Sequence, residues 1–260
     1  MSSENQMTFW EHLDELRKVL FRSALFIAAF MVVIFLAKDF VFGKIILAPI
    51  DSDFALYRLF DSVLVKFGLP ALEPFKIELI NIELSAQFFI HISTSFYLAL
   101  VISMPFIIYQ IWLFVKPALY DNERKAAIGA FTFAGILFFM GVLVGYYLIF
   151  PLTLRFLGTY QVSPDVANQI SLQSYISMFT WLILIMGVVF EMPSLAAILS
   201  KIGILSKSFL KSYRKHAFVI LLVVAAFITP SGDPFTLMAV GFPLYALYEL
   251  SILVCRDFDK

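Results

Sequence analysis

The sequence lacks the motifs by which most enzyme classes are recognised. It contains no HExxH, GxSxG or P-loop pattern and no glycine-rich dinucleotide-binding pattern. Its three histidines, which could otherwise act as bases or metal ligands, fall near the ends of different apolar runs (His12, His91 and His216). Catalysis is therefore not expected, and the sequence predicts neither a cofactor nor a metal site.

Cysteine and charge are also scarce. The single cysteine, Cys255, excludes a disulfide within the chain. Charged residues make up only 15% of the sequence, and the 19 basic residues balance the 19 acidic ones. The net charge therefore favours no nucleic-acid partner, and none is expected.

Apolar residues, in contrast, are abundant. They make up 61% of the sequence, and the mean hydropathy is +0.90, far above the range of soluble globular proteins. A large buried core would explain the composition, but repeated apolar runs of nearly 20 residues favour membrane spans. We predict an all-α polytopic membrane protein that forms one transmembrane domain over residues 1–260. Its six predicted transmembrane helices cover residues 19–37, 86–115, 126–150, 175–199, 217–228 and 235–255.

The last two predicted spans are short. Residues 217–228 supply only 12 apolar residues, which as a helix cover about 18 Å of a hydrocarbon core about 30 Å thick. A re-entrant or buried helix is the alternative. The turn signal TPSGDP at residues 229–234 favours two spans, and the membrane is expected to thin locally beside them.

Lysine and arginine placement predicts the orientation. With six spans, most basic residues fall in the amphipathic segment 1–18, the loops 116–125 and 201–215, and the C-terminal tail. Fewer fall on the other side, which includes the long loop 38–84. We therefore expect both termini, the segment 1–18 and these two loops to be cytoplasmic, and the loop 38–84 to be extracytoplasmic. The predicted location is the cytoplasmic (inner) membrane.

Two of these segments show helical periodicity. Apolar residues recur every three or four positions in the N-terminal segment (Phe9, Leu13, Leu16 and Leu20). This spacing predicts an amphipathic helix that lies on the membrane surface and begins at Thr8. Thr8 and Glu11 are expected to form a capping box at its start. In the long loop, similar spacing predicts a helix over residues 53–68, and residues 76–84 are expected to be extended.

Carboxylates are the candidates for function. Glu191 lies within the fourth predicted span, where an ionisable group costs about 2.5–3.5 kcal/mol and should face a partner or a wet cavity. A hydrogen bond to a neighbouring helix is the alternative, although Pro193 frees a backbone carbonyl nearby and favours a polar pocket. Cytoplasmic acids also cluster beside the first two spans, where most would form a solvated charged face.

Five motifs in a fixed order carry a resemblance to a known family. They are HLDELRK (residues 12–18), YQIWLFVKPALYDNERK (109–125), GYYLIFPL (145–152), FEMP (190–193) and ITPSGDPFT (228–236). With these motifs the whole chain resembles TatC, the receptor subunit of the twin-arginine protein translocase. The last motif departs from the common pattern, because it has an inserted glycine and no double proline.

The resemblance implies roles for particular residues. Glu15 and Glu123 match the acidic pair that receives the two arginines of a signal peptide. Arg17 and Phe114 match further parts of that site, and the hinge positions that shape it are matched by Pro117 and Leu119. Glu191 matches an intramembrane polar residue that helps a partner's helix or the signal to dock, and two other positions match functional ones (Pro49 and Asp233).

The predicted function is that of a non-enzymatic receptor and core subunit of the twin-arginine translocase. The resemblance implies binding of twin-arginine signal peptides and export of folded proteins driven by the proton gradient. It also implies a multimeric complex with TatA-type and TatB-type single-span membrane proteins, and the basic cytoplasmic face is expected to attract membrane lipids. The alternative is a proton-coupled small-solute transporter that uses Glu191, although no inverted repeat is apparent.

Overall fold

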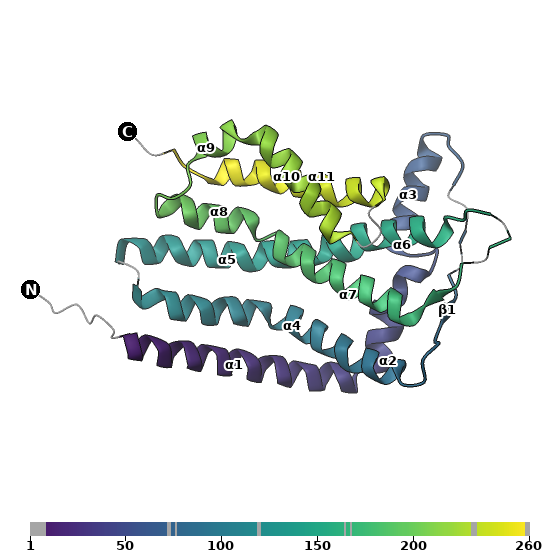
Figure 1. The fold of residues 1–260 in the computed structure, drawn as a ribbon, viewed down its shortest axis with the longest axis horizontal. Helices are drawn as coiled ribbons and strands as arrows, with labels where there is room; N and C mark the ends of the chain where they lie inside the picture. The colour runs from purple at the N-terminus through teal and green to yellow at the C-terminus, as the bar shows by residue number, and fades with distance from the viewer. Residues whose placement is uncertain are drawn as a thin grey trace, which may run out of the picture.

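The computed structural model describes residues 9–71, 74–75, 77–118, 121–163, 165–166, 168–229 and 233–257, which form a bundle of long helices (Figure 1). The elements in chain order are α1 (Phe9–Leu36), α2 (Lys38–Phe40), the π-helical turn η1 (Val41–Ile46), the 3-10 turn η2 (Ala48–Ile50), α3 (Ala55–Lys66), β1 (Leu79–Ile80), α4 (Ala86–Val115), the 3-10 turn η3 (Lys116–Ala118), α5 (Asp121–Val144), the π-helical turn η4 (Gly145–Ile149), α6 (Phe150–Thr159), β2 (Ile170–Ser171), α7 (Leu172–Val189), α8 (Met192–Lys201), α9 (Lys207–Ser212), α10 (Arg214–Ile228) and α11 (Pro234–Val254).

Within the described residues, five helical stretches are long and apolar enough to cross a membrane. They are Trp10–Leu36, Ala86–Val115, Phe131–Thr159, Leu172–Lys201 and Pro234–Val254. The prediction of an all-helical polytopic chain is therefore confirmed. The remaining predicted span corresponds to α10, whose 15 residues cover about 22 Å. The prediction that the last span is also short is wrong, because α11 has 21 residues and covers about 31 Å.

The sequence predicts that the third span ends at residue 150, just before Pro151, but the helix does not end there. Instead α5 passes through the π-helical turn η4 into α6, and the helical rod continues to Thr159. Pro151 is the second residue of α6. Proline is tolerated in the first turn of a helix, and the wider π-helical turn creates such a first turn inside a continuing rod. The proline therefore adjusts the path of the helix without ending it.

The N-terminal amphipathic segment is not a separate helix on the membrane surface. One helix, α1, runs without a break from Phe9 to Leu36, and its sequence contains no glycine or proline at which it could end. The segment predicted to be cytoplasmic therefore forms the first turns of the first span. Thr8 lies outside the described residues, so the capping box stays a prediction.

The long loop 38–84 packs against one end of the bundle, to the right in Figure 1. Its helix α3 agrees with the predicted helix over residues 53–68. Part of the segment predicted to be extended forms β1, in which Leu79 and Ile80 pair in parallel with Ile170 and Ser171 of β2.

Three tyrosine hydroxyls tie this loop to the spans. Tyr146 and Tyr175 donate to the carbonyls of Ile45 and Ile46 over 2.9 and 2.5 Å. The hydroxyl of Tyr57 lies 3.0 Å from the carbonyl oxygen of Pro151. Burial raises the pKa of Tyr57, so its hydroxyl stays protonated and available as a donor. Two of these bonds satisfy carbonyls at the π-helical turn η1 of the loop, and the third satisfies a carbonyl in the first turn of α6.

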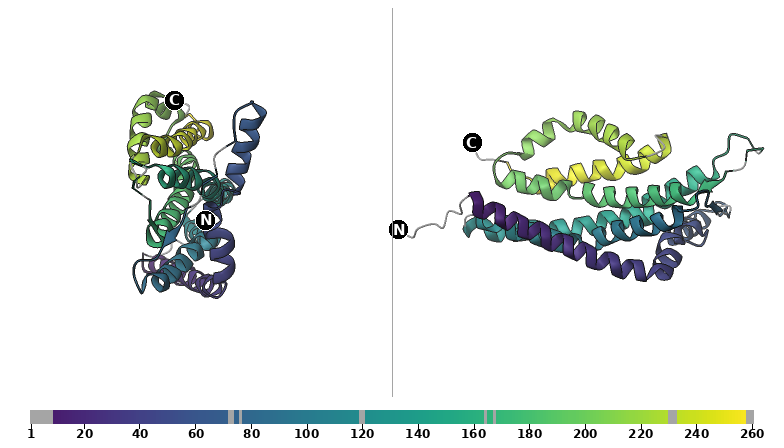
Figure 2. Two further views of the ribbon diagram at one scale, coloured as in Figure 1. Left: turned by 90° about the vertical axis from the view of Figure 1, so that its right-hand side faces the viewer. Right: turned by 60° about the horizontal axis from the view of Figure 1, so that its bottom comes forward.

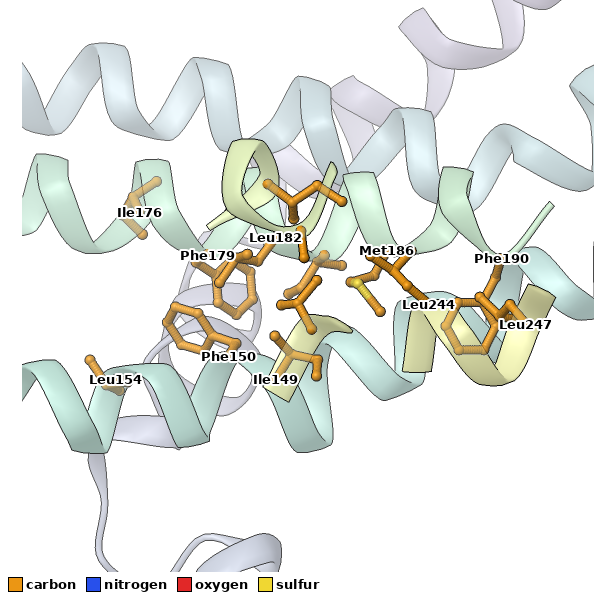
Figure 3. Packing of buried hydrophobic residues seen from close by; sticks show 14 of the residues in the cluster. Ile149, Phe150, Leu154, Ile176, Phe179, Leu182, Met186, Phe190, Leu244 and Leu247 are labelled. Carbon is orange, nitrogen blue, oxygen red and sulfur yellow. The ribbon is translucent and has the colours of Figure 1, made fainter. Parts of the chain in front are cut away.

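The centre of the bundle is a core of interlocking apolar side chains. Ile149 and Phe150 from the π-helical turn and α6 meet Leu182 and Met186 from α7 and Leu244 from α11 (Figure 3). All five side chains are essentially inaccessible to solvent.

Glycine lets α5 and α7 approach closely beside this core. A Cβ atom added at Gly141 would overlap the carbonyl oxygen of Met186 and lie 2.7 Å from Cβ of Phe190. A Cβ atom at Gly187 would lie equally close to the ring of Phe138. The contact therefore depends on the absence of side chains on both helices.

Candidate functional site

The candidates that the sequence predicts to be cytoplasmic come from elements that meet at one end of the bundle. The N-terminal turns of α1, the C-terminal turn of α4 and the first turn of α5 lie together at the left in Figure 1. Glu15 is on α1, Phe114 is in the last turn of α4 and Glu123 is in the first turn of α5. Between the last two, Pro117 is exposed in the turn η3. The side chain of Glu123 and the whole of Leu119 lie outside the described residues.

Glu15 belongs to the stripe of α1 that faces α4. His12, Glu15, Val19 and Ser23 recur at three- and four-residue intervals, and Val19 and Ser23 are buried. At the end of the stripe, the ring of His12 stacks on that of Phe114, with centroids 4.2 Å apart and planes 24° apart. The carboxylate of Glu15 therefore sits one helical turn from this pair of rings.

The carboxylate of Glu15 forms an ion pair with Lys18, one turn further along α1. Lys18 Nζ lies 2.6 Å from Glu15 Oε1, and the two side chains are 55% and 38% exposed. Exposed pairs three residues apart on a helix contribute little to stability, because solvent screens them. A ligand with a planar guanidinium group could displace this lysine.

Arg17 is not brought to the same face. Two residues along an α-helix lie about 200° apart, so Arg17 points away from the stripe that carries Glu15. Its side chain is exposed. The structure thus places Glu15 one helical turn from His12, whose ring stacks on Phe114, and leaves Arg17 on the opposite side of α1.

Glu191 lies at the break between α7 and α8. It occupies the N-cap position of α8 and is half-buried. Ser194 donates to Glu191 Oε2 over 2.5 Å. This partner is on the helix that Glu191 itself begins, and not on a neighbouring helix. Among the described residues, the buried Oε1 atom has no hydrogen-bond partner.

The two remaining candidates, Pro49 and Asp233, accept hydrogen bonds at the other end of the bundle. Pro49 is buried in η2, and its carbonyl accepts a hydrogen bond from the hydroxyl of Tyr57 over 3.3 Å. Asp233 is the N-cap of α11, where its carboxylate accepts from the backbone N–H of Thr236 over 2.8 Å. Functional roles for both residues stay predictions.

Two residues at these sites escaped the sequence reasoning. The sequence places His12 only near the end of an apolar run, but its place three positions before Glu15 puts it on the same helix face. Ser194 follows Glu191 by the same interval of three residues.

In the described part of the chain, no group of three or more histidine, cysteine or acidic residues could hold a metal ion.

Comparison with known proteins identifies the family. Residues 11–243 match the family described as Sec-independent protein translocase protein (TatC). The TatC protein of Blattabacterium sp. subsp. Periplaneta americana is 38% identical, and the alignment covers 100% of this chain and 98% of that protein. The TatC protein of Deinococcus radiodurans is 33% identical, over 96% of this chain and 86% of that protein.

The fold is shared with solved structures as well. A crystal structure of the twin-arginine translocase receptor TatC in DDM superposes with a TM-score of 0.74. It is 32% identical in sequence, and the match covers 95% of this chain and 100% of that chain. A second crystal structure of the twin-arginine translocase receptor TatC gives a TM-score of 0.71 at the same identity. The chain therefore belongs to the TatC family of Sec-independent protein translocase proteins.

Proposed function

We propose that this chain is the receptor and core subunit of a twin-arginine translocase, with its signal-peptide site at the cytoplasmic ends of α1, α4 and α5. Membership of the TatC family makes it a transport protein and not an enzyme. The observation that carries the proposed site is the position of Glu15 on the α4-facing stripe of α1, one turn from His12, whose ring stacks on Phe114 of α4. The cargo is a folded protein, and the proton gradient drives its export.

The chemistry of the site suits a pair of arginines. A carboxylate can accept two parallel hydrogen bonds from a planar guanidinium group, which the ammonium group of lysine cannot match. Glu15 supplies one carboxylate on α1, and Glu123 supplies a second from the first turn of α5. Two carboxylates on adjoining helix ends would bind both arginines of one peptide.

A crosslinking experiment tests the site. A photoreactive residue at position 16, beside Glu15, is expected to crosslink a twin-arginine signal peptide. The same residue at position 36, at the far end of α1, should not, and both positions are accessible. Changing the Arg-Arg pair of the peptide to Lys-Lys should weaken the first crosslink several-fold. Equal crosslinking at both positions, or no effect of the lysine peptide, would contradict the site.

We further propose six spans in the cytoplasmic (inner) membrane, with both termini in the cytoplasm. In support of this, α10 and α11 fold back on each other as an antiparallel hairpin (Figure 2), and the first and last described residues lie at the same end of the bundle. The basic loop at residues 201–215 lies at that end too. An even number of crossings requires α10 to be a short span.

Glu191 is the proposed docking point for TatA-type and TatB-type single-span partners within a multimeric complex. Its unpaired Oε1 atom could accept a hydrogen bond from a partner's helix. We expect Glu191→Ala to reduce co-purification of such partners by about tenfold, as loss of one bond to a carboxylate predicts. Glu83→Ala, which removes an exposed carboxylate from the long loop, is the control. Undiminished recovery of partners with Glu191→Ala would rule out this role.

The alternative of a proton-coupled solute transporter receives no support from the relatives. Both the family match and the similar structures are translocase proteins. Proton-coupled uptake of a small solute by vesicles that contain this protein alone would still favour that alternative.

A further inference from the structure

The stacked pair of His12 and Phe114 is the most specific contact between α1 and α4 at the cytoplasmic end. Their ring centroids lie 4.2 Å apart with an interplanar angle of 24°, so the rings overlap face to face. Both side chains are only half-buried, so each ring keeps part of its surface accessible. Because the rings stack face to face, only the faces that they turn away from each other offer a planar aromatic surface.

Glu15 lies directly beside this surface. Residues three positions apart on a helix have Cβ atoms about 5–6 Å apart, so the carboxylate of Glu15 and the imidazole of His12 are neighbours. A guanidinium group that donates hydrogen bonds to the carboxylate of Glu15 would lie within the roughly 6 Å over which a cation interacts with an aromatic face.

We infer that His12 and Phe114 form a stacking platform for one guanidinium group of the arginine pair, and that His12 helps the receptor to distinguish arginine from lysine. This inference rests on the proposed function and adds a specificity-determining residue to it. Guanidinium groups are planar and stack on aromatic faces, whereas the ammonium group of lysine is compact and strongly hydrated. The carboxylate of Glu15 attracts either cation, and the platform favours the planar one.

The test measures the ratio of affinities for an Arg-Arg and a Lys-Lys signal peptide, by titration of labelled peptides onto the full chain in detergent. We expect His12→Leu to reduce this ratio by about two- to fivefold, the range of one exposed cation–aromatic contact. His12→Phe, which keeps a planar ring, should preserve the ratio. His216→Leu is the matched control. His216 lies on α10 and its ring packs beside the exposed ring of Tyr213, the N-cap residue of that helix.

The outcomes separate the inference from the function on which it rests. An unchanged ratio in His12→Leu, or an equal reduction in His12→Phe, would overturn the platform. If the unmodified protein does not prefer the Arg-Arg peptide, the proposed function itself fails. Thermal unfolding of each variant checks folding. Should His12→Leu not fold, Phe114→Leu removes the platform from α4 and is expected to reduce the ratio by the same factor.

Discussion

Replacing both Glu15 and Glu123 with glutamine is expected to weaken binding of a twin-arginine signal peptide by at least about 100-fold and to abolish export. Glutamine keeps the size of each side chain but removes the charge that strengthens its hydrogen bonds to a guanidinium group. Because the two residues come from adjoining helix ends, each single variant should retain part of the affinity. Peptide titration in detergent and an export assay in cells measure the two effects.

Asp14→Asn supplies the matched control for this double variant. Asp14 is exposed on α1 and adjoins Glu15, but it lies about 100° around the helix from it. Its replacement removes one nearby negative charge without touching the stripe that faces α4, so binding should stay close to that of the unmodified protein. If the double variant binds the peptide as tightly as this control does, the two-carboxylate site is wrong.

Gly141→Leu is expected to prevent most molecules of the protein from folding. Even a Cβ atom at this position would overlap a backbone oxygen of α7, which cannot move without displacing the helix. Inserting extra side-chain atoms into a packed core costs about 1–3 kcal/mol or more, a large fraction of a protein's net stability. The yield of monodisperse protein in detergent and its thermal unfolding midpoint measure the effect.

The same helix offers a matched control. Gly135 lies six residues earlier in α5, and a Cβ atom there would have no neighbour within 4 Å. Gly135→Leu adds the same apolar side chain to a position with open space around it, and leucine favours helix more than glycine does. We therefore expect a yield and midpoint near those of the unmodified protein. Equal behaviour of the two variants would show that the α5–α7 contact does not need glycine.

The spans could be predicted because their apolar runs are long. Where the prediction went wrong, a local signal was read without its structural context. Pro151 signals a helix end in most sequences, but here a π-helical turn precedes it and the rod continues to Thr159. The charged N-terminal residues suggested a separate surface helix, but nothing in the sequence of α1 interrupts it. Composition shows where polarity changes, and a helix need not end there.

The positions of the candidate residues were predicted in part. The motifs singled out Glu15 and Phe114 as candidates, and helical periodicity alone would have placed His12 on the face of Glu15 and Arg17 on the other. Contacts between distant parts of the chain were beyond such reasoning. The hydroxyl of Tyr57 bonds to Pro151, 94 residues later, and periodicity carries no information on which distant segments meet. The partner of Glu191 was nearer, because Ser194 follows it by three residues.

The tyrosine bonds of the long loop also set an order of assembly during synthesis. Ile45 and Ile46 leave the ribosome well before the residues that donate to their carbonyls, by 101 residues for Tyr146 and 129 for Tyr175. At about 5–20 residues per second, the second bond must wait roughly 6–26 s. These two tyrosine bonds are absent while α4 and most of α5 are made. The first loop can therefore complete these contacts with the spans only once the start of α7 has been made.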